Sequence, residues 1–182
     1  MAYCSNWRYI FSVFTSGYSD NIYSELLQKP YYFSLIGIYE LHHHLHHPQE
    51  HMNLADLEKA LQKSWSKETS YSPESWTVDN PAVGQCAITA LVVNDYHGGE
   101  IVWADVALSD GQAISHYFNL INGKEIDLSR SQFPEGTVIP KGTMKNKNFP
   151  TTRDFMLSND NTKKRYEILK VTVIAAKQLV NE

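Results

Sequence analysis

The spacing of apolar residues predicts an amphipathic helix near residue 52 and a second helix, buried on all sides, that begins at Cys86. In "MNLADLEKALQKSW" (residues 52–65) apolar residues recur at helical spacing, and Asn53 stands where an N-cap is expected. These apolar residues are Leu54, Leu57, Ala60, Leu61 and Trp65. In "CAITALVVNDY" (residues 86–96) aliphatic residues cover every face, which is typical of a helix without a solvent-facing side. The "HGG" that follows is typical of a helix C-terminus.

The segment "EIVWADVALSDGQAISHYFNLINGKEIDLS" (residues 100–129) predicts three antiparallel strands. The first covers residues 100–108, whose aliphatic and aromatic residues suit a mostly buried strand. Asp110-Gly111 predicts the first turn, and Asn122-Gly123 predicts the second as a two-residue hairpin loop. Helices and strands together predict an α+β fold, with the buried helix packed on an antiparallel β-meander.

The remaining segments are predicted to be loops and flanking helices. Residues 66–84 and 134–150 contain turn residues throughout, and the second of these loops either flanks the site or stays apart from it. A short helix is predicted to start after Thr151 or Thr152. From Thr162, "KKRYEILKVTVIAAKQLV" predicts a closing helix, although its run "ILKVTVI" is β-branched enough for a strand.

Composition narrows the class of protein. The net charge of −4 and the pI of about 6.0 argue against a nucleic-acid-binding protein, and the basic cluster 163–165 is typical of a solvated helix start. The two cysteines, Cys4 and Cys86, do not make a disulfide framework and suit a reducing cytoplasm. No apolar run reaches the roughly 18 residues that a membrane span needs. We therefore expect a soluble cytoplasmic protein with no nucleic-acid partner and no membrane span.

Residues 1–51 differ in character from the rest of the chain. They contain seven of the eleven tyrosines and six of the eight histidines, five of these within residues 42–47. Neighbouring imidazoles bind transition metals, but a specific site needs a second shell that fixes the ligands. We favour incidental metal affinity and predict no metal site. Residues 1–51 are interpreted as an N-terminal extension that is dispensable, and residues 52–182 as the functional domain.

Cys86 has two interpretations. At the first turn of a buried helix, unpaired backbone N–H groups and the positive end of the helix dipole favour a thiolate over a thiol. The same N–H groups can hold an oxyanion during acyl transfer. The alternative is an inert core thiol, because cysteine is among the most buried residue types.

The second hairpin is predicted to place His116 and Asp127 on one face of the sheet. The expected pairs are Ile121 with Lys124, Phe118 with Asp127, and His116 with Ser129. Directly opposed residues share a face, and so do residues two apart, so His116 and Asp127 are diagonal neighbours. Asn119 has the opposite parity and points the other way.

Cys86, His116 and Asp127 together match the requirements of nucleophilic catalysis. A cysteine nucleophile needs a base, and the base needs an acceptor that orients it. Each residue also has a structural explanation: a core thiol, a hydrogen-bonded strand histidine, and an aspartate that caps a turn. The combination favours the catalytic interpretation.

Several neighbouring residues are further candidates for the site. Gln85 is either a second oxyanion donor or the N-cap of the helix. Trp76 either walls a substrate groove or packs in the core under its loop, and we favour the core. Arg130 and Gln132 either bind a substrate carboxylate or fix their own loop, and we favour the loop.

The blocks "GQC", "SHYFN" and "DLSRSQF", with the closing "RYEILKVTV", resemble the YunG-like family of small bacterial proteins. The resemblance covers roughly residues 53–173. The layout also looks like the core of the papain and transglutaminase-like superfamily, in which a cysteine on a helix precedes a histidine and an aspartate on consecutive strands. That resemblance implies Cys86 as nucleophile, His116 as general base and acid, Asp127 as orienting residue, and Gln85 as oxyanion donor.

We therefore expect a cysteine-dependent hydrolase or acyltransferase of papain/transglutaminase-like fold. Its substrate is expected to be a small-molecule or peptide acyl compound with an amide or thioester-like bond, and the chemistry requires no cofactor. The alternative is a non-catalytic binding module that keeps the fold, with Cys86 as a core residue.

Overall fold

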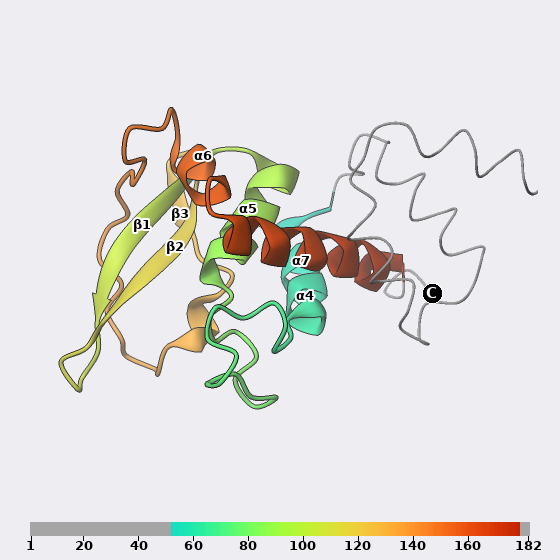
Figure 1. Ribbon diagram of the computed structural model, residues 1–182, viewed down its shortest axis with the longest axis horizontal. Helices are drawn as coiled ribbons and strands as arrows, with labels where there is room; N and C mark the ends of the chain where they lie inside the picture. Colours follow the sequence, from blue (N-terminus) through green and yellow to red (C-terminus); the bar gives the residue numbers. More distant parts are fainter. Residues whose placement is uncertain (1–51, 179–182) are drawn as a thin grey trace, which may run out of the picture. The chain divides into compact units, whose positions relative to one another are not determined.

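The computed structural model describes residues 52–178, in which helices pack beside a three-stranded antiparallel sheet (Figure 1). The chain divides into two units, Met1–His43 and His44–Glu182, and the described residues all belong to the second. The elements are α4 (Leu54–Ser64), α5 (Cys86–His97), β1 (Glu100–Ala107), β2 (Ala113–Ile121), β3 (Lys124–Ile126), the 3-10 helix η1 (Arg130–Gln132), α6 (Thr152–Leu157) and α7 (Asp160–Gln178). The α+β class is confirmed. The predicted extension, residues 1–51, lies outside the described residues together with its histidine tract.

The helix ends follow the capping residues of the sequence. Asn53 Oδ1 accepts a hydrogen bond from the Asp56 amide at 2.9 Å and begins α4, as predicted. Thr151 and Asp154 form a reciprocal capping box at the start of α6, which confirms the short helix. Gly98, at a φ of 65°, ends α5.

Helix α7 settles the ambiguity at the C-terminal end of the described chain in favour of a helix. Its buried residues Tyr166, Leu169, Val173 and Ala176 recur at helical spacing. Thr172, within the β-branched run, gives its hydroxyl hydrogen bond to the carbonyl oxygen of Leu169 at 2.9 Å. The apolar stripe therefore outweighs the β-branched propensity, because burial of that stripe contributes more than the local preference.

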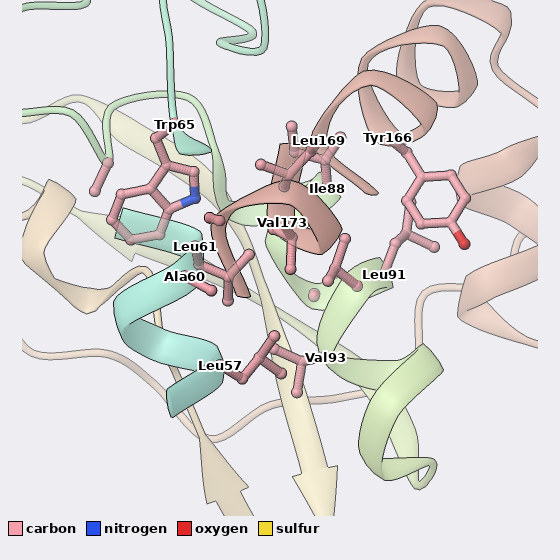
Figure 2. Packing of buried hydrophobic residues seen from close by; sticks show 14 of the residues in the cluster. Leu57, Ala60, Leu61, Trp65, Ile88, Leu91, Val93, Tyr166, Leu169 and Val173 are labelled. Atoms are coloured by element: carbon pink, nitrogen blue, oxygen red, sulfur yellow. The ribbon is translucent and has the colours of Figure 1, made fainter. Parts of the chain in front are cut away.

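The main core lies among α4, α5 and α7 (Figure 2). Leu57 and Leu61 of α4 and Leu169 and Val173 of α7 meet the buried residues of α5, where every residue from Ile88 to Val93 is buried. Burial on all sides is thus confirmed for α5. The helix also packs on β2, where the Asn119 side chain donates to the Ala90 carbonyl at 3.0 Å. This bond fixes α5 along the sheet.

The sheet has the predicted order but a shorter third strand. Asn122 and Gly123, with φ of 51° and 76°, form the two-residue loop, and Ile121 pairs with Lys124 as expected. The ladder ends at Ile126, so the expected pairs of Phe118 with Asp127 and of His116 with Ser129 do not form. The cause is local: Asp127 Oδ1 accepts hydrogen bonds from the amide and hydroxyl of Ser129, both at 3.1 Å, and this turn bends the chain into η1.

The face of the sheet opposite α5 carries a smaller apolar cluster. Val102, Ala104 and Phe118 are buried there, with Leu120 and Ile139 packed against them. Gly142 closes this cluster, since a Cβ at this position would lie 2.9 Å from Phe118 and closer still to Val102. His116 shares the parity of Phe118 and is fully buried on this face.

An ion pair joins α6 and α7 to the C-terminal half of α5. Arg153 donates to Asp95 at 2.7 Å and to the Tyr166 hydroxyl at 3.1 Å, and this hydroxyl donates to the second Asp95 oxygen at 2.5 Å. Arg153 also donates to the Leu91 carbonyl and the Asn94 side chain, both at 3.1 Å. The guanidinium group of Arg153 thus donates a hydrogen bond to each of these four residues.

We expect Arg153→Met to lower the free energy of unfolding by about 2 kcal/mol. Removing one partner of a buried ion pair costs roughly 3 to 5 kcal/mol, and solvent screening reduces this because the Arg153 side chain is 28% exposed. Urea denaturation measures the change. Lys59→Met is the control, since Lys59 pairs with Asp56 on the exposed surface of α4 and its loss should cost less than about 0.5 kcal/mol. Equal stability of the Arg153 variant and the wild type would contradict the prediction.

Candidate active site

Cys86 is the first residue of α5 and lies 8% exposed beside the loop that precedes it. The chain reaches it through Gly84, whose φ of 72° suits glycine. A Cβ at Gly84 would also lie 2.8 Å from the backbone nitrogen atoms of Tyr71 and Ser72. Glycine is thus needed at position 84, where two loop segments pack closely just before the thiol.

The end of α5 that carries Cys86 lies at the edge of β2 that the short β3 leaves free. The amide and carbonyl of Trp103 both bond to Thr143 on the outer edge of β1, at 2.8 and 2.9 Å. Tyr117, opposite Trp103, therefore turns its backbone groups to the β3 edge. Cys86 Sγ lies 4.0 Å from the Ser115 carbonyl on this edge, and the backbone amide of Tyr117 is among the groups that lower the pKa of the thiol. The early end of β3 thus leaves room for the thiol.

His116 and Asp127 meet as predicted, although not through a strand ladder. His116 Nε2 lies 2.7 Å from Asp127 Oδ2, and the other carboxylate oxygen is held by Ser129. The imidazole packs against the rings of Phe118 and Phe133, with centroids 5.5 and 4.9 Å away. Both partners of the bond are therefore held in place, and Nδ1 is the ring nitrogen left for other contacts.

The thiol and the imidazole alter each other's pKa. Burial raises the pKa of Cys86, but the hydrogen bond and charge of His116, with the amides of Tyr117 and Ala87, lower it below the ordinary value. Burial lowers the pKa of His116, but its interactions with Asp127 and with Cys86 raise it to about 9. These shifts favour a thiolate beside an imidazolium.

Gln132 of η1 opposes this charge separation. Its Nε2 lies 3.0 Å from His116 Nδ1 and 3.3 Å from the Ser129 carbonyl oxygen. Because that oxygen only accepts, the NH₂ end of the amide faces both groups, and Gln132 donates to Nδ1. This hydrogen bond favours the neutral form of His116, with its proton on Nε2, toward Asp127. Protonation of Nδ1 requires the Gln132 side chain to turn away, since two donors cannot face each other.

Gln132 is therefore part of the site, whereas the sequence favoured a role in fixing the loop. It does both, because the bond to Ser129 also fixes η1. Arg130 fixes the loop as predicted, by donating to the Thr137 carbonyl. The sequence contains one indication that Gln132 belongs to the site, namely that it follows Asp127 by only five residues. This spacing does not predict the direction of the side chain, which depends on the turn at Ser129.

Arg165 of α7 is a buried cation near the same end of α5. It is 5% exposed and donates to Asn161 Oδ1 at 2.8 Å and to the Thr69 carbonyl at 3.2 Å, two neutral acceptors. Burial lowers the pKa of Arg165, and the negative charge of Cys86 is the first influence that raises it. Its positive charge thus favours the Cys86 thiolate.

The solvated helix start predicted for residues 163–165 holds for Lys163 and Lys164, which are exposed, and is wrong for Arg165. The helical stripe could have revealed this, because Arg165 precedes Leu169 by one turn and shares its buried face.

The side chains of Gln85 and Trp76 form hydrogen bonds with the loop that precedes Cys86. Gln85 stands at the N-cap position without a side-chain capping bond, and its Nε2 donates to the Ser66 carbonyl at 2.9 Å. Trp76 is half-buried and donates from its indole nitrogen to the Pro81 carbonyl at 3.0 Å. Both side chains therefore fasten the loop 66–84, and no contact with His116 or Asp127 is recorded for either within residues 52–178.

Two other properties concern ligands and membranes. Within the part of the chain that the structure describes, no three side chains among histidine, cysteine, aspartate and glutamate gather as metal ligands. None of the helices found between residues 52 and 178 has the length and apolar character of a membrane span.

Comparison with known proteins identifies the family. The family described as YunG protein matches residues 53–178. A relative from Bacillus subtilis (strain 168), named "Uncharacterized protein YunG", is 40% identical over 73 residues, which cover 40% of this chain and 56% of that protein. The match thus spans little more than half the length of this relative. No solved structure matches the chain significantly. Because the family match covers more than half of the 182 residues, the chain belongs to the YunG family.

Proposed function

We propose that this protein is a cysteine-dependent hydrolase or acyltransferase that acts on an amide or thioester-like bond. The observation that carries the proposal is the pair of buried His116 and half-buried Asp127, joined at 2.7 Å, beside a cysteine at the N-terminus of a helix. In this proposal Cys86 is the nucleophile, His116 the general base and acid, and Asp127 the residue that orients the imidazole. Residues 52–182 would then form a papain/transglutaminase-like domain.

The proposed reaction has two halves. The Cys86 thiol gives its proton to His116 Nδ1, and the sulfur attacks the carbonyl carbon, so that a C–S bond forms and the oxygen becomes an oxyanion. Collapse breaks the bond to the leaving group, which takes the proton from His116. In the second half His116 accepts a proton from water or an acceptor nucleophile, whose attack breaks the C–S bond and returns the thiol.

The oxyanion would be met by backbone amides rather than by the Gln85 side chain. The N–H groups in the first turn of α5 have no partner within the helix, and the amides of Ala87 and Tyr117 both lower the pKa of Cys86. The Gln85 NH₂ group is occupied by Ser66. We therefore propose the backbone of α5 and of β2 as the main donors.

The first test is the rate at which iodoacetamide alkylates Cys86 as a function of pH, followed by mass spectrometry. We expect an inflection below the pKa of about 8.5 of a free thiol. At pH 6 the native protein should react at least about tenfold faster than the urea-unfolded chain, in which Cys4 and Cys86 serve as ordinary thiols. The sign follows from the lowered pKa of Cys86: labelling rises as pH passes that value, since only the thiolate reacts.

An amide or thioester substrate found in a subsequent screen should show a bell-shaped pH dependence. The rising limb reports the Cys86 thiol, and the falling limb near 9 reports loss of the His116 proton that the leaving group needs. Protection of Cys86 from alkylation at every pH below unfolding would contradict the proposal. That outcome would favour the alternative, a binding module in which Cys86 is an inert core thiol.

A further inference from the structure

An aromatic and cationic cluster lies next to Cys86 on the side of the sheet that faces α5, the side that Asn119 also faces. Lys145 Nζ stands 3.8 Å from the centre of the Trp103 ring and 3.3 Å from Ser115 Oγ. The Trp103 indole nitrogen donates to the same Ser115 hydroxyl at 2.6 Å. The cluster, which consists of Trp103, Ser115 and Lys145, thus holds the ammonium group in place through a ring face and a hydroxyl.

The same residue that holds Lys145 also touches the thiol. Ser115 binds the ammonium group through its side chain, and its carbonyl oxygen lies 4.0 Å from Cys86 Sγ. A molecule that binds Lys145 is therefore separated from the Cys86 thiol by Ser115 alone. Ser115 is exposed, and Trp103 and Lys145 are half-buried, so the cluster is open to a ligand.

The cluster offers hydrogen-bond donors. The Ser115 hydroxyl oxygen accepts from Trp103 and Lys145, and the Ser115 side chain is also within hydrogen-bond reach of the Tyr117 hydroxyl. The ammonium group of Lys145 keeps further N–H donors and makes no ion pair within 4.0 Å among the described residues. Burial and the charge of Lys147 both lower the pKa of Lys145, and Asp105 raises it, so a negative charge is favoured here.

We propose that Trp103, Ser115 and Lys145 form a subsite for a carboxylate carried by the acyl substrate of Cys86. This inference rests on the proposed function and adds the charge of the substrate to it. Lys145 holds the carboxylate, Ser115 keeps the ammonium group in place, and the Trp103 ring packs against the adjoining carbon atoms. Asp105, opposite Ser115 on β1, is the nearby acidic group and weakens the preference.

The test compares two alkylating reagents of similar size, iodoacetate and iodoacetamide, of which only the first carries a carboxylate. We expect the ratio of their rates at Cys86, at pH 7 and low salt, to fall about threefold in Lys145→Met. It should rise in Asp105→Asn, which removes the opposing charge. In the wild type the ratio should fall toward the Lys145→Met value at about 1 M salt, where the Debye length is roughly 3 Å.

Lys141→Met is the matched control, because Lys141 lies exposed in the same loop and makes no recorded contact with the cluster. An unchanged ratio in Lys145→Met, or an equal fall in Lys141→Met, would overturn the subsite while both reagents still label Cys86. Failure of both reagents to label native Cys86 overturns the proposed function itself, and the subsite with it. Iodoacetamide rates that stay constant across the variants show that the thiol is intact.

Discussion

His116→Ala is expected to slow the alkylation of Cys86 at pH 6 by about 100-fold. The hydrogen bond and positive charge of His116 are the main influences that lower the pKa of the thiol, and burial acts in the opposite direction. Without the imidazole, burial prevails and the pKa returns to at least about 8.5. Each unit by which the pKa rises reduces the thiolate fraction tenfold at any pH below both values.

The measurement is the second-order rate of iodoacetamide labelling from pH 5 to 9. His97→Ala is the matched control, because His97 lies at the opposite end of α5 and the substitution is the same. Asp127→Asn tests the same chain of contacts more gently: asparagine keeps an acceptor for His116 Nε2 but removes the charge, and a roughly tenfold loss is expected. If the alanine variant does not fold, this second variant still decides the question. A pH profile unchanged in both variants would show that His116 does not activate the thiol.

Gln132→Met is expected to act in the opposite direction and to speed labelling of Cys86 below pH 6 by about tenfold. The Gln132 amide donates to His116 Nδ1 and so stabilises the neutral imidazole. Methionine has a similar length and no N–H group, so the lone pair of Nδ1 becomes free for the proton of the thiol. One neutral hydrogen bond contributes roughly 0.5 to 1.5 kcal/mol, which corresponds to about one pKa unit at most.

The same labelling series measures this effect, with Gln112→Met as the control. Gln112 is exposed in the turn between β1 and β2, so its replacement should leave the rate unchanged. Gln132→Glu separates the hydrogen bond from the loss of bulk, since a carboxylate accepts from protonated Nδ1 and should favour the imidazolium. A slower rate in Gln132→Met would mean that Gln132 supports the thiolate, and the role inferred from its hydrogen bonds would be wrong.

The two predictions describe a site in which charge and hydrogen bonding compete. Asp127 and the buried Arg165 favour the charged pair, and Gln132 favours the neutral one. A ligand that displaces the Gln132 amide from Nδ1 would release the base at the moment the substrate binds. The ratio of the labelling rates of Gln132→Met and the wild type measures how strongly the Gln132 hydrogen bond holds His116 in its neutral form.

The sequence alone determined the elements whose signals are local. Helical spacing of apolar residues, capping side chains and the Asn122-Gly123 turn each act within a few residues, so α4, α5, α6 and the hairpin follow from the chain. The parity of the hairpin also placed His116 and Asp127 on one face, because side chains alternate along a strand whatever surrounds it.

Only the tertiary structure decided the contacts between segments far apart in the chain. The turn between Asp127 and Ser129 that ends β3 is local. Only the packing of α5 on the sheet, however, brings Cys86 to the Ser115 carbonyl on the edge that β3 leaves free. The direction of the Gln132 amide and the burial of Arg165 depend on groups from other elements. The periodicity of a sequence indicates which face of an element is apolar. The strength of a hydrogen bond or a charge interaction depends instead on the distance between its partners, and that distance is set by the packing of the elements.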